Sequence, residues 1–587
     1  MFKKSTSFIR GMRNAHIDPD EVLLDAFNLP SFDTDQFEGR VERSIQGRVS
    51  IALGAVVALI FSIFLFQAWN LQVARGEALS LLSQRNRLDN EVLFAARGVV
   101  YDRQGRELAW NIPPEFDPEE GAFDTFSLRT YTDREGFAHL LGFVGYPEKD
   151  SSGFWWRTNY LGKAGVERSL DSLLQGKNGQ RIIEVNALDA IQSQNIVRAP
   201  VDGENVTLSI DADVQQALFK ALRDGAQASG FIGGAGVIMD VETGEVLALT
   251  NYPEYSPQVM TDGTDNEAIA SYATQAGQPF LNRVVLGEYT PGSIVKPYIA
   301  AAALAEGLVT PSTSILSTGE IRVPNPYSPG NDTVFRDWKA HGWVNVVDAL
   351  AVSSNVYFYS VGGGFGNQLG LGIERLASYA TRFGIGIPTG IELDAESSGV
   401  VPTPAWKRDV FGADDPWRIG NTYHTAIGQF GFLMTPIQAL RYISAIANGG
   451  TLVTPHVVKG APRARSVVGI SDEHLKIVRS GMQKGAESGT AAAVNVPGIR
   501  IAAKTGTAQL GRNNESMNSW VIGFWPADKP QFAFAVVLEK APANTLRGAA
   551  PAMRSFFEWL AVNNPEYARG EYPASVDSLV QGEHEKL

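Results

Sequence analysis

A long uncharged segment near the start of the chain limits how the rest of the protein can fold. Between Val49 and Ala74 no residue is charged, and the stretch 51–69 is dense in Ala, Val, Leu, Ile and Phe. An α-helix of about 20 apolar residues spans a bilayer. A buried core helix of this length normally has a polar face, and a cleaved signal peptide is shorter and ends at a small-residue site. We therefore predict a transmembrane helix at 49–69.

The charges beside this helix predict its orientation. Arg40, Arg43 and Arg48 precede it, whereas only Arg75 follows it closely. Positive residues accumulate on the cytoplasmic side of membrane helices. We therefore predict a single-pass protein with a cytosolic tail at 1–48 and most of the chain outside the cytoplasm.

The composition excludes several classes of function. A chain of 587 residues exceeds one hydrophobic core, so we expect two or three domains. The absence of cysteine excludes disulfides, thiolate catalysis and cysteine-ligated metals. The net charge of −13 argues against a nucleic-acid partner. With seven histidines and no H-E-x-x-H spacing, we expect neither a metal nor a cofactor.

After the membrane helix, the segment 70–203 is predicted to form a β-rich pedestal. A helix is expected to continue through 71–94, and a hairpin to begin at 99–101 with a polar turn after it. The segment 111–137, rich in Pro, Glu and Asp, is expected to be irregular.

The segment 204–565 is predicted to be an α+β domain. A block of helices separates early strands from late ones, which indicates an antiparallel sheet flanked by helices, plus a helical subdomain. We expect a C-terminal tail at 566–587. The predicted strands are 206–210, 236–239, 246–249, 519–524 and 532–538.

The first of three chemical motifs is Ser293-Ile294-Val295-Lys296, at the predicted start of an Ala-rich helix. There, free N–H groups stabilise a developing anion. Lys296 shares a helical face with Ser293, and a desolvated lysine is able to remove the proton of a serine hydroxyl. We interpret Ser293 as a nucleophile and Lys296 as its base; the alternative is a capping serine and a surface lysine.

The second motif, Ser353-Ser354-Asn355, lies between two apolar runs. Buried hydroxyl and amide groups need hydrogen-bond partners. A relay that joins Lys296, Ser353 and Lys504 would supply them, and Asn355 would hold a substrate amide. The alternative is a helix-capping cluster.

The third motif, Lys504-Thr505-Gly506-Thr507, follows a strand-like segment. Strand alternation places Lys504 and Gly506 on one face, and a glycine permits close approach of another backbone. The cation and hydroxyls suit a substrate carboxylate, and the N–H groups of Thr507 and Ser293 would form an oxyanion hole. In this order, the three motifs predict a serine acyl-transfer site without histidine.

On these residues the chain resembles the class B penicillin-binding proteins, membrane-anchored D,D-transpeptidases of peptidoglycan synthesis. The resemblance runs from the membrane helix to about residue 565 and is greatest to the elongation, or rod-shape, subfamily called penicillin-binding protein 2. Further shared motifs are Arg97-Gly98, Asp102-Arg103-Gln104-Gly105, Gly165-Val166-Glu167, Ile427-Gly428-Gln429, Thr435-Pro436, Phe335-Arg336-Asp337-Trp338-Lys339, Tyr357-Phe358-Tyr359 and Thr389-Gly390-Ile391-Glu392-Leu393.

The resemblance implies an activity and roles for single residues. It implies cross-linking of stem peptides that end in D-Ala-D-Ala, penicillin binding, a bacterial cell membrane, a pedestal of the dimerisation type, and a polytopic glycosyltransferase of the SEDS (RodA-like) type as partner. The implied roles are acylated nucleophile for Ser293, base for Lys296, and proton transfer and substrate holding for Ser353 and Asn355. Lys504, Thr505 and Thr507 would bind the terminal carboxylate, and Gly506 belongs to the same substrate-binding stretch.

The chain departs from the family pattern in four places. Asn421 replaces an aspartate, Phe430 replaces a glycine after Gln429, the region 111–139 is short, and no cysteine is available for the metal site of some relatives. The alternatives are a division-type transpeptidase, a D,D-carboxypeptidase that uses water, and a non-catalytic scaffold or β-lactam sensor. The lack of an E-x-x-L-N segment disfavours a class A β-lactamase.

Overall fold

The computed structural model describes residues 47–79, 88–114, 116–117, 122–123, 126–185, 191–325, 330–462, 464–511 and 513–573. Most of the predicted cytosolic tail and the end of the predicted C-terminal tail lie outside these residues. The chain divides into two compact units, Met1–Asp89 with Ile183–Ser193, and Asn90–Ile182 with Gln194–Leu587.

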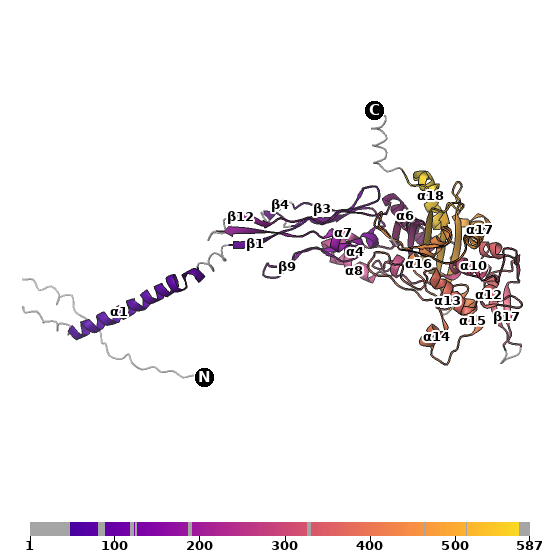
Figure 1. Ribbon diagram of the computed structural model, residues 1–587, viewed down its shortest axis with the longest axis horizontal. Helices are drawn as coiled ribbons and strands as arrows, with labels where there is room; N and C mark the ends of the chain where they lie inside the picture. The colour runs from indigo at the N-terminus through magenta and orange to yellow at the C-terminus, as the bar shows by residue number, and fades with distance from the viewer. Residues whose placement is uncertain are drawn as a thin grey trace, which may run out of the picture. The chain divides into compact units, whose positions relative to one another are not determined.

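The apolar segment near the start of the chain is helical, as predicted. Helix α1 (Gly47–Trp69) is labelled in Figure 1. It continues into a π-helical turn, η3 (Asn70–Ala74). The span Ile51–Ala74 has a mean hydropathy of 2.5, and none of it is buried. Among the described residues it is the one helix long and apolar enough to cross a membrane.

The helix predicted for 71–94 is wrong at its end. Leu88–Leu93 is a strand, β1, in a sheet of order β1-β11-β12, with β11 at Gly179–Val185 and β12 at Ile191–Arg198. The hydrogen-bond partners of β1 come from residues far along the chain. A local sequence pattern does not reveal such partners.

A four-stranded sheet of order β13-β2-β3-β6 follows. Strands β2 (Val100–Tyr101) and β3 (Glu107–Ile112) form the predicted hairpin. Strand β6 (Leu128–Tyr131) pairs with β3, so the prediction of irregular structure over 111–137 is wrong there. Strand β13 (Val206–Thr207) lies parallel to β2. Nearby short elements are α3 (Ala138–Leu141), α4 (Gly165–Ser169), α5 (Asp171–Leu174), β4 (Phe116–Asp117), β5 (Ala122–Phe123), β7 (Val144–Gly145), β8 (Glu148–Lys149), β9 (Trp155–Arg157) and β10 (Leu161–Gly162).

A buried ionic cluster joins this sheet to α4. Arg97 Nε donates to Glu167 Oε2 at 2.6 Å, and Arg129 Nε donates to Glu167 Oε1 at 2.7 Å. Both ends of each pair are buried. Burial alone would raise the pKa of Glu167, but the charges of Arg129 and Arg97 outweigh it and lower that pKa. The carboxylate is therefore ionised and links three segments of the chain.

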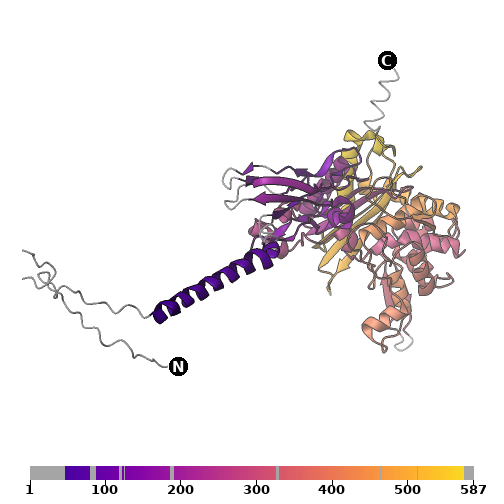
Figure 2. The ribbon, with the colours of Figure 1, turned by 60° about the vertical axis from the view of Figure 1, so that its left-hand side comes forward.

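The second unit contains a five-stranded antiparallel sheet of order β15-β14-β24-β23-β22. Figure 2 shows its late strands, in yellow, beside helices from the middle of the chain, in pink and orange. Its strands are β14 (Gly233–Asp240), β15 (Val246–Tyr252), β22 (Ala502–Leu510), β23 (Ser516–Trp525) and β24 (Phe532–Pro542).

Side chains of this sheet alternate between two hydrophobic cores, because successive residues of a strand point to opposite faces. Ile238 packs in a core with α6 (Ala212–Ser229) and α18 (Ala549–Asn563). Its neighbour Val237 packs in the other core with α10 (Lys296–Ala305) and α16 (Pro436–Ala447). The predicted α+β fold is therefore present as a sheet between two layers of helices.

The remaining helices belong to the predicted helical subdomain or to the two helical layers that pack against the sheet. The described start of the predicted tail 566–587 is packed, since Tyr567 of α19 is buried. These elements are α7 (Pro257–Asp262), α8 (Asn266–Thr274), α9 (Arg283–Leu286), α11 (Val346–Ala351), α12 (Asn355–Gly363), α13 (Gly372–Arg382), α14 (Pro404–Phe411), α15 (Ile419–Thr425), α17 (Asp472–Ser488), η5 (Ala492–Val494) and α19 (Pro565–Ala568), with short strand pairs β16 (Ile315–Ser317) and β19 (Gly342–Val344), β17 (Glu320–Val323) and β18 (Thr333–Arg336), and β20 (Thr451–Val453) and β21 (Arg465–Val467).

We expect Glu167→Gln to lower the free energy of unfolding by about 3 to 5 kcal/mol, because it leaves two buried guanidinium groups without their shared counter-charge. Urea titration of the full-length chain in detergent, followed by tryptophan fluorescence, measures the change. Glu135→Gln, which removes one partner of an exposed pair with Arg223, is the matched control and should cost less than about 1 kcal/mol. Equal, small changes in both variants would contradict this account.

Candidate active site

Ser293 lies at the start of a buried helix, as the sequence predicts. Gly292–Val295 forms a 3₁₀ turn, η4, which passes directly into α10. The side chain of Lys296, the first residue of α10, is fully buried. Ser293 is partly exposed and lines a cleft. The turn thus presents the hydroxyl to solvent and the lysine to the interior.

A glycine allows strand β22 to reach this turn. A Cβ at Gly506 would lie 2.6 Å from Pro291 O and 2.9 Å from Ile294 Cγ2, both closer than atoms in ordinary contact. Any side chain at this position would force the strand away from the turn. Gly506 therefore determines how closely β22 approaches Ser293.

The ammonium groups of two lysines meet at one serine hydroxyl. Lys504 Nζ donates to Ser353 Oγ at 2.8 Å, and Lys296 Nζ donates to the same oxygen at 3.2 Å. Lys296 Nζ also donates to Ser353 O at 2.8 Å and to Asn355 Oδ1 at 2.7 Å. Hydrogen bonds therefore join all three motifs.

Burial shifts the protonation of both lysines. It lowers the pKa of Lys296 to about 7, although the negative charge of Asp337 opposes the shift. Burial lowers the pKa of Lys504 well below its ordinary value, and the positive charge of Lys296 lowers it further. An amine with a pKa near 7 is unprotonated in a large fraction of molecules at neutral pH and is then able to accept a proton. The site therefore contains a base without histidine.

Asp337 organises the segment after Ser353, a role that sequence reasoning missed. Its Oδ2 accepts from Ser354 Oγ at 2.8 Å and from Val356 N at 3.0 Å. Ser354 in turn accepts from Tyr357 N at 3.3 Å, so the helix-capping interpretation of the motif is correct for Ser354. The only sequence signal was the place of Asp337 in a family motif.

The backbone of Ser353 is strained. Its φ of 57° lies in the left-handed region, which costs a residue with a side chain about 1 to 2 kcal/mol. Such strain persists where surrounding contacts over-determine the conformation. Here Lys296 holds the carbonyl of Ser353, and Asp337 holds the residues that follow.

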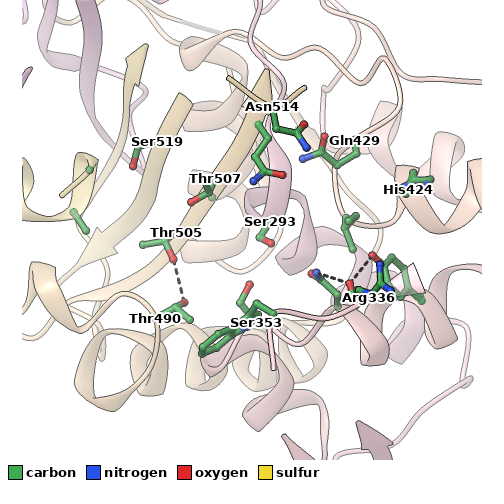
Figure 3. Close-up of a pocket in the computed structure, with 18 of the residues that line it drawn as sticks. Ser293, Arg336, Ser353, His424, Gln429, Thr490, Thr505, Thr507, Asn514 and Ser519 are labelled. Atoms are coloured by element: carbon green, nitrogen blue, oxygen red, sulfur yellow. Dashed lines mark hydrogen bonds between the residues drawn. The ribbon is translucent and has the colours of Figure 1, made fainter. Parts of the chain in front are cut away.

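Ser293 opens into a cleft of about 920 Å³. In Figure 3, Thr505 lies on one side of Ser293 and Gln429 on the other. Thr505 Oγ1 donates to Thr490 Oγ1 at 3.0 Å, and the neighbouring Thr507 is exposed to the cleft. Lining residues that sequence reasoning missed include Arg336, Trp338, His424, Thr490, Asn514 and Ser519.

The described residues also bear on metal binding. Among them, no three His, Cys, Asp or Glu side chains are grouped so as to hold a metal ion. The groups that the structure brings to Ser293 are instead amines, hydroxyls and amides. These groups move protons and bind carboxylates or carbonyls without a metal.

We expect acylation of Ser293 to accelerate as pH rises through about 7, because Lys296 must lose its proton to act as a base. Asp337→Asn removes the charge that raises the pKa of Lys296, so the midpoint of the pH profile should move to lower pH. It also replaces one of the two acceptor oxygens with an NH2 group, so either Trp338 N or the donors Ser354 and Val356 lose their acceptor. The maximal rate should therefore fall by about 10- to 100-fold.

Stopped-flow measurement with a fluorescent serine-acylating probe, from about pH 5.5 to 8.5, records both effects. Asp348→Asn, which changes a surface pair with Lys484, is the control and should leave the midpoint unchanged. A wild-type midpoint and rate in Asp337→Asn would show that Asp337 plays no part in the site.

Comparisons with known proteins show which family this chain is similar to. The penicillin binding protein transpeptidase domain matches residues 234–558, and the penicillin-binding protein dimerisation domain matches residues 122–208. The peptidoglycan D,D-transpeptidase MrdA of Acinetobacter baumannii is 30% identical to this chain and covers 85% of each chain.

Two solved structures extend the similarity to the fold. A chain from a peptidoglycan synthase complex that coordinates polymerization and crosslinking is 28% identical, with a TM-score of 0.68 over 90% of this chain and 100% of that one. Penicillin-binding protein 2 of Helicobacter pylori, in complex with MreC, is 27% identical, with a TM-score of 0.66 over 81% of this chain and 99% of that one.

The transpeptidase match covers more than half of the sequence and contains all three motifs that the structure joins around Ser353. The dimerisation-domain match lies mostly in the pedestal, and the apolar helix suggests a single-pass membrane anchor. The chain belongs to the class B penicillin-binding proteins and is a peptidoglycan D,D-transpeptidase of the MrdA, or penicillin-binding protein 2, type that acts in cell elongation.

Proposed function

We propose that Ser293 is the acylated nucleophile of this transpeptidase and that Lys296 is its base. The proposal rests on two hydrogen bonds: Lys296 and Lys504 both donate to Ser353 Oγ, next to the turn that bears Ser293. Unprotonated Lys296 accepts the hydroxyl proton of Ser293. Ser353 lies between the two amines, so it relays protons within the site, and Asn355 holds Lys296 and the substrate amide.

In the first half-reaction, Ser293 Oγ attacks the carbonyl carbon of the penultimate D-Ala. The N–H groups of Ser293 and Thr507 stabilise the oxyanion. The C–N bond then breaks as the nitrogen of the terminal D-Ala takes a proton from Ser353, and Ser353 regains a proton from protonated Lys296, which returns to its unprotonated form. In the second half-reaction, an amine from a neighbouring stem peptide attacks the ester, forms the cross-link and returns a proton to Ser293.

The terminal carboxylate of the donor binds at strand β22. Thr505 and Thr507 present two hydroxyls to the cleft, and Lys504, on the opposite face of the strand, donates to Ser353 Oγ behind them. Thr490 orients the hydroxyl of Thr505. This arrangement selects peptides with a free C-terminus.

A D,D-carboxypeptidase, in which water replaces the amine, is the second candidate. It uses the same acyl-enzyme at Ser293 and differs only in the molecule that attacks the ester. A non-catalytic scaffold or sensor has no need of a lysine whose burial makes it a base.

We further propose that α1 anchors the chain in the bacterial cell membrane, with residues 1–48 in the cytoplasm. The pedestal would comprise 70–203, the catalytic domain 204–565 and the tail 566–587. The proposed partner is a polytopic glycosyltransferase of the SEDS (RodA-like) type. Similarity to a chain from a complex of polymerization and crosslinking supports this proposal.

We expect Ser293→Ala to abolish covalent labelling of the full-length chain by a fluorescent penicillin, because the nucleophile is lost. Ser488→Ala changes an exposed serine on α17 and should label like the wild type. Persistent labelling of Ser293→Ala would reject the assignment of the nucleophile. Product analysis with a D-Ala-D-Ala donor and a soluble amine then separates the two candidates, since transfer gives a joined peptide and hydrolysis gives only shortened donor and D-Ala.

A further inference from the structure

Phe430 lies next to the catalytic turn. Gly292 N donates to Gly428 O at 3.0 Å, and a Cβ at Gly428 would lie 2.2 Å from Gly292 O. Gly428, two residues before Phe430, is therefore pressed against the turn that bears Ser293. Phe430 lines the same cleft as Ser293.

The backbone of Phe430 has the conformation of a glycine. Its φ is 61°, in the left-handed region. That conformation costs a residue with a side chain about 1 to 2 kcal/mol, whereas glycine adopts it freely. The benzyl group is therefore held here against the backbone preference, and contacts of its ring offset the cost.

Aromatic neighbours hold the ring in one position. Its centroid lies 5.6 Å from that of Trp417, 5.9 Å from that of Trp406 and 6.2 Å from that of Phe411. The buried Lys407 places its ammonium 5.7 Å from the same centroid. Edge-to-face aromatic pairs favour defined geometry, so the ring forms a rigid wall. Phe430 is partly exposed, and its free surface borders the cleft.

The Phe430 ring lies where the acyl half of a bound donor peptide would extend. Figure 3 places Thr505 and Gln429 on opposite sides of Ser293, and Phe430 is the residue after Gln429. With the terminal carboxylate at Thr505, the leaving D-Ala occupies that side of Ser293. A peptide has a fixed direction, so its acyl half extends toward Gln429 and Phe430.

We propose that Phe430 is a specificity-determining residue whose ring contacts the aliphatic side chain that directly precedes D-Ala-D-Ala in the donor stem peptide. This inference rests on the proposed function, because the direction of the donor follows from carboxylate binding at Thr505. An aliphatic chain buries apolar surface against the ring, whereas a donor with glycine at that position has nothing to bury.

The test compares two soluble donors, diacetyl-L-lysyl-D-Ala-D-Ala and acetylglycyl-D-Ala-D-Ala, on the full-length chain in detergent. The second-order rate constant of Ser293 acylation is measured for each donor by competition with fluorescent penicillin. We expect the wild type to prefer the lysyl donor, and Phe430→Ala and Phe430→Gly to reduce its rate constant by about tenfold. The rate constant of the glycyl donor should change less than about twofold, since it makes no contact with the ring.

The two variants separate the ring from the backbone. Phe430→Gly relieves the left-handed strain, whereas Phe430→Ala keeps it, so a ring contact predicts equal losses in both. Phe154→Ala, which removes an exposed ring outside the cleft, is the control and should keep the wild-type preference.

An unchanged preference for the lysyl donor in both variants would overturn the proposal, and so would a loss confined to Phe430→Gly. Failure of penicillin and of both donors to acylate the wild type would instead reject the proposed function, so the two failures are distinct.

Discussion

Strand β22 lies against the turn that bears Ser293 with no side chain between them, and the chemistry of the site depends on this contact. A Cβ at Gly506 would lie 2.6 Å from Pro291 O, so glycine is needed at the point of closest approach. Because the strand comes so near, Lys504 on the same strand face is buried and reaches Ser353. The distance between the sheet and the helix therefore sets the distances among the three motifs.

The same contact explains why the site tolerates two buried amines. The charged form of a lysine is unfavourable when the ammonium is buried away from water, so burial lowers the pKa of the lysine. Lys296 and Lys504 both donate hydrogen bonds to Ser353 Oγ. The negative charge of Asp337 partly opposes the lowering of the Lys296 pKa. The result is an amine that titrates near neutral pH. Burial of the lysines costs folding stability, but the lowered pKa that results is useful for proton transfer.

Sequence reasoning succeeded where the structure is local and failed where it depends on distant segments. Ser293 and Lys296 share one helical turn, and strand alternation placed Lys504 and Gly506 on one face of the strand, so these local placements were predictable. The antiparallel sheet was predicted because a block of helices separates early strands from late ones. Strand β1 was mistaken for helix because its partners lie far along the chain. Asp337 was missed because its partners are on α12, and no sequence pattern reveals that Phe430 has a positive φ.

The most direct test of this account is the acylation rate of Gly506→Ala, measured with fluorescent penicillin on the full-length chain in detergent. The added methyl group should displace β22 from the Ser293 turn and reduce the rate by about 100-fold or more. Circular dichroism should remain that of the wild type, because the sheet keeps its other strand contacts. Acylation at the wild-type rate would contradict the claim that this close contact assembles the site.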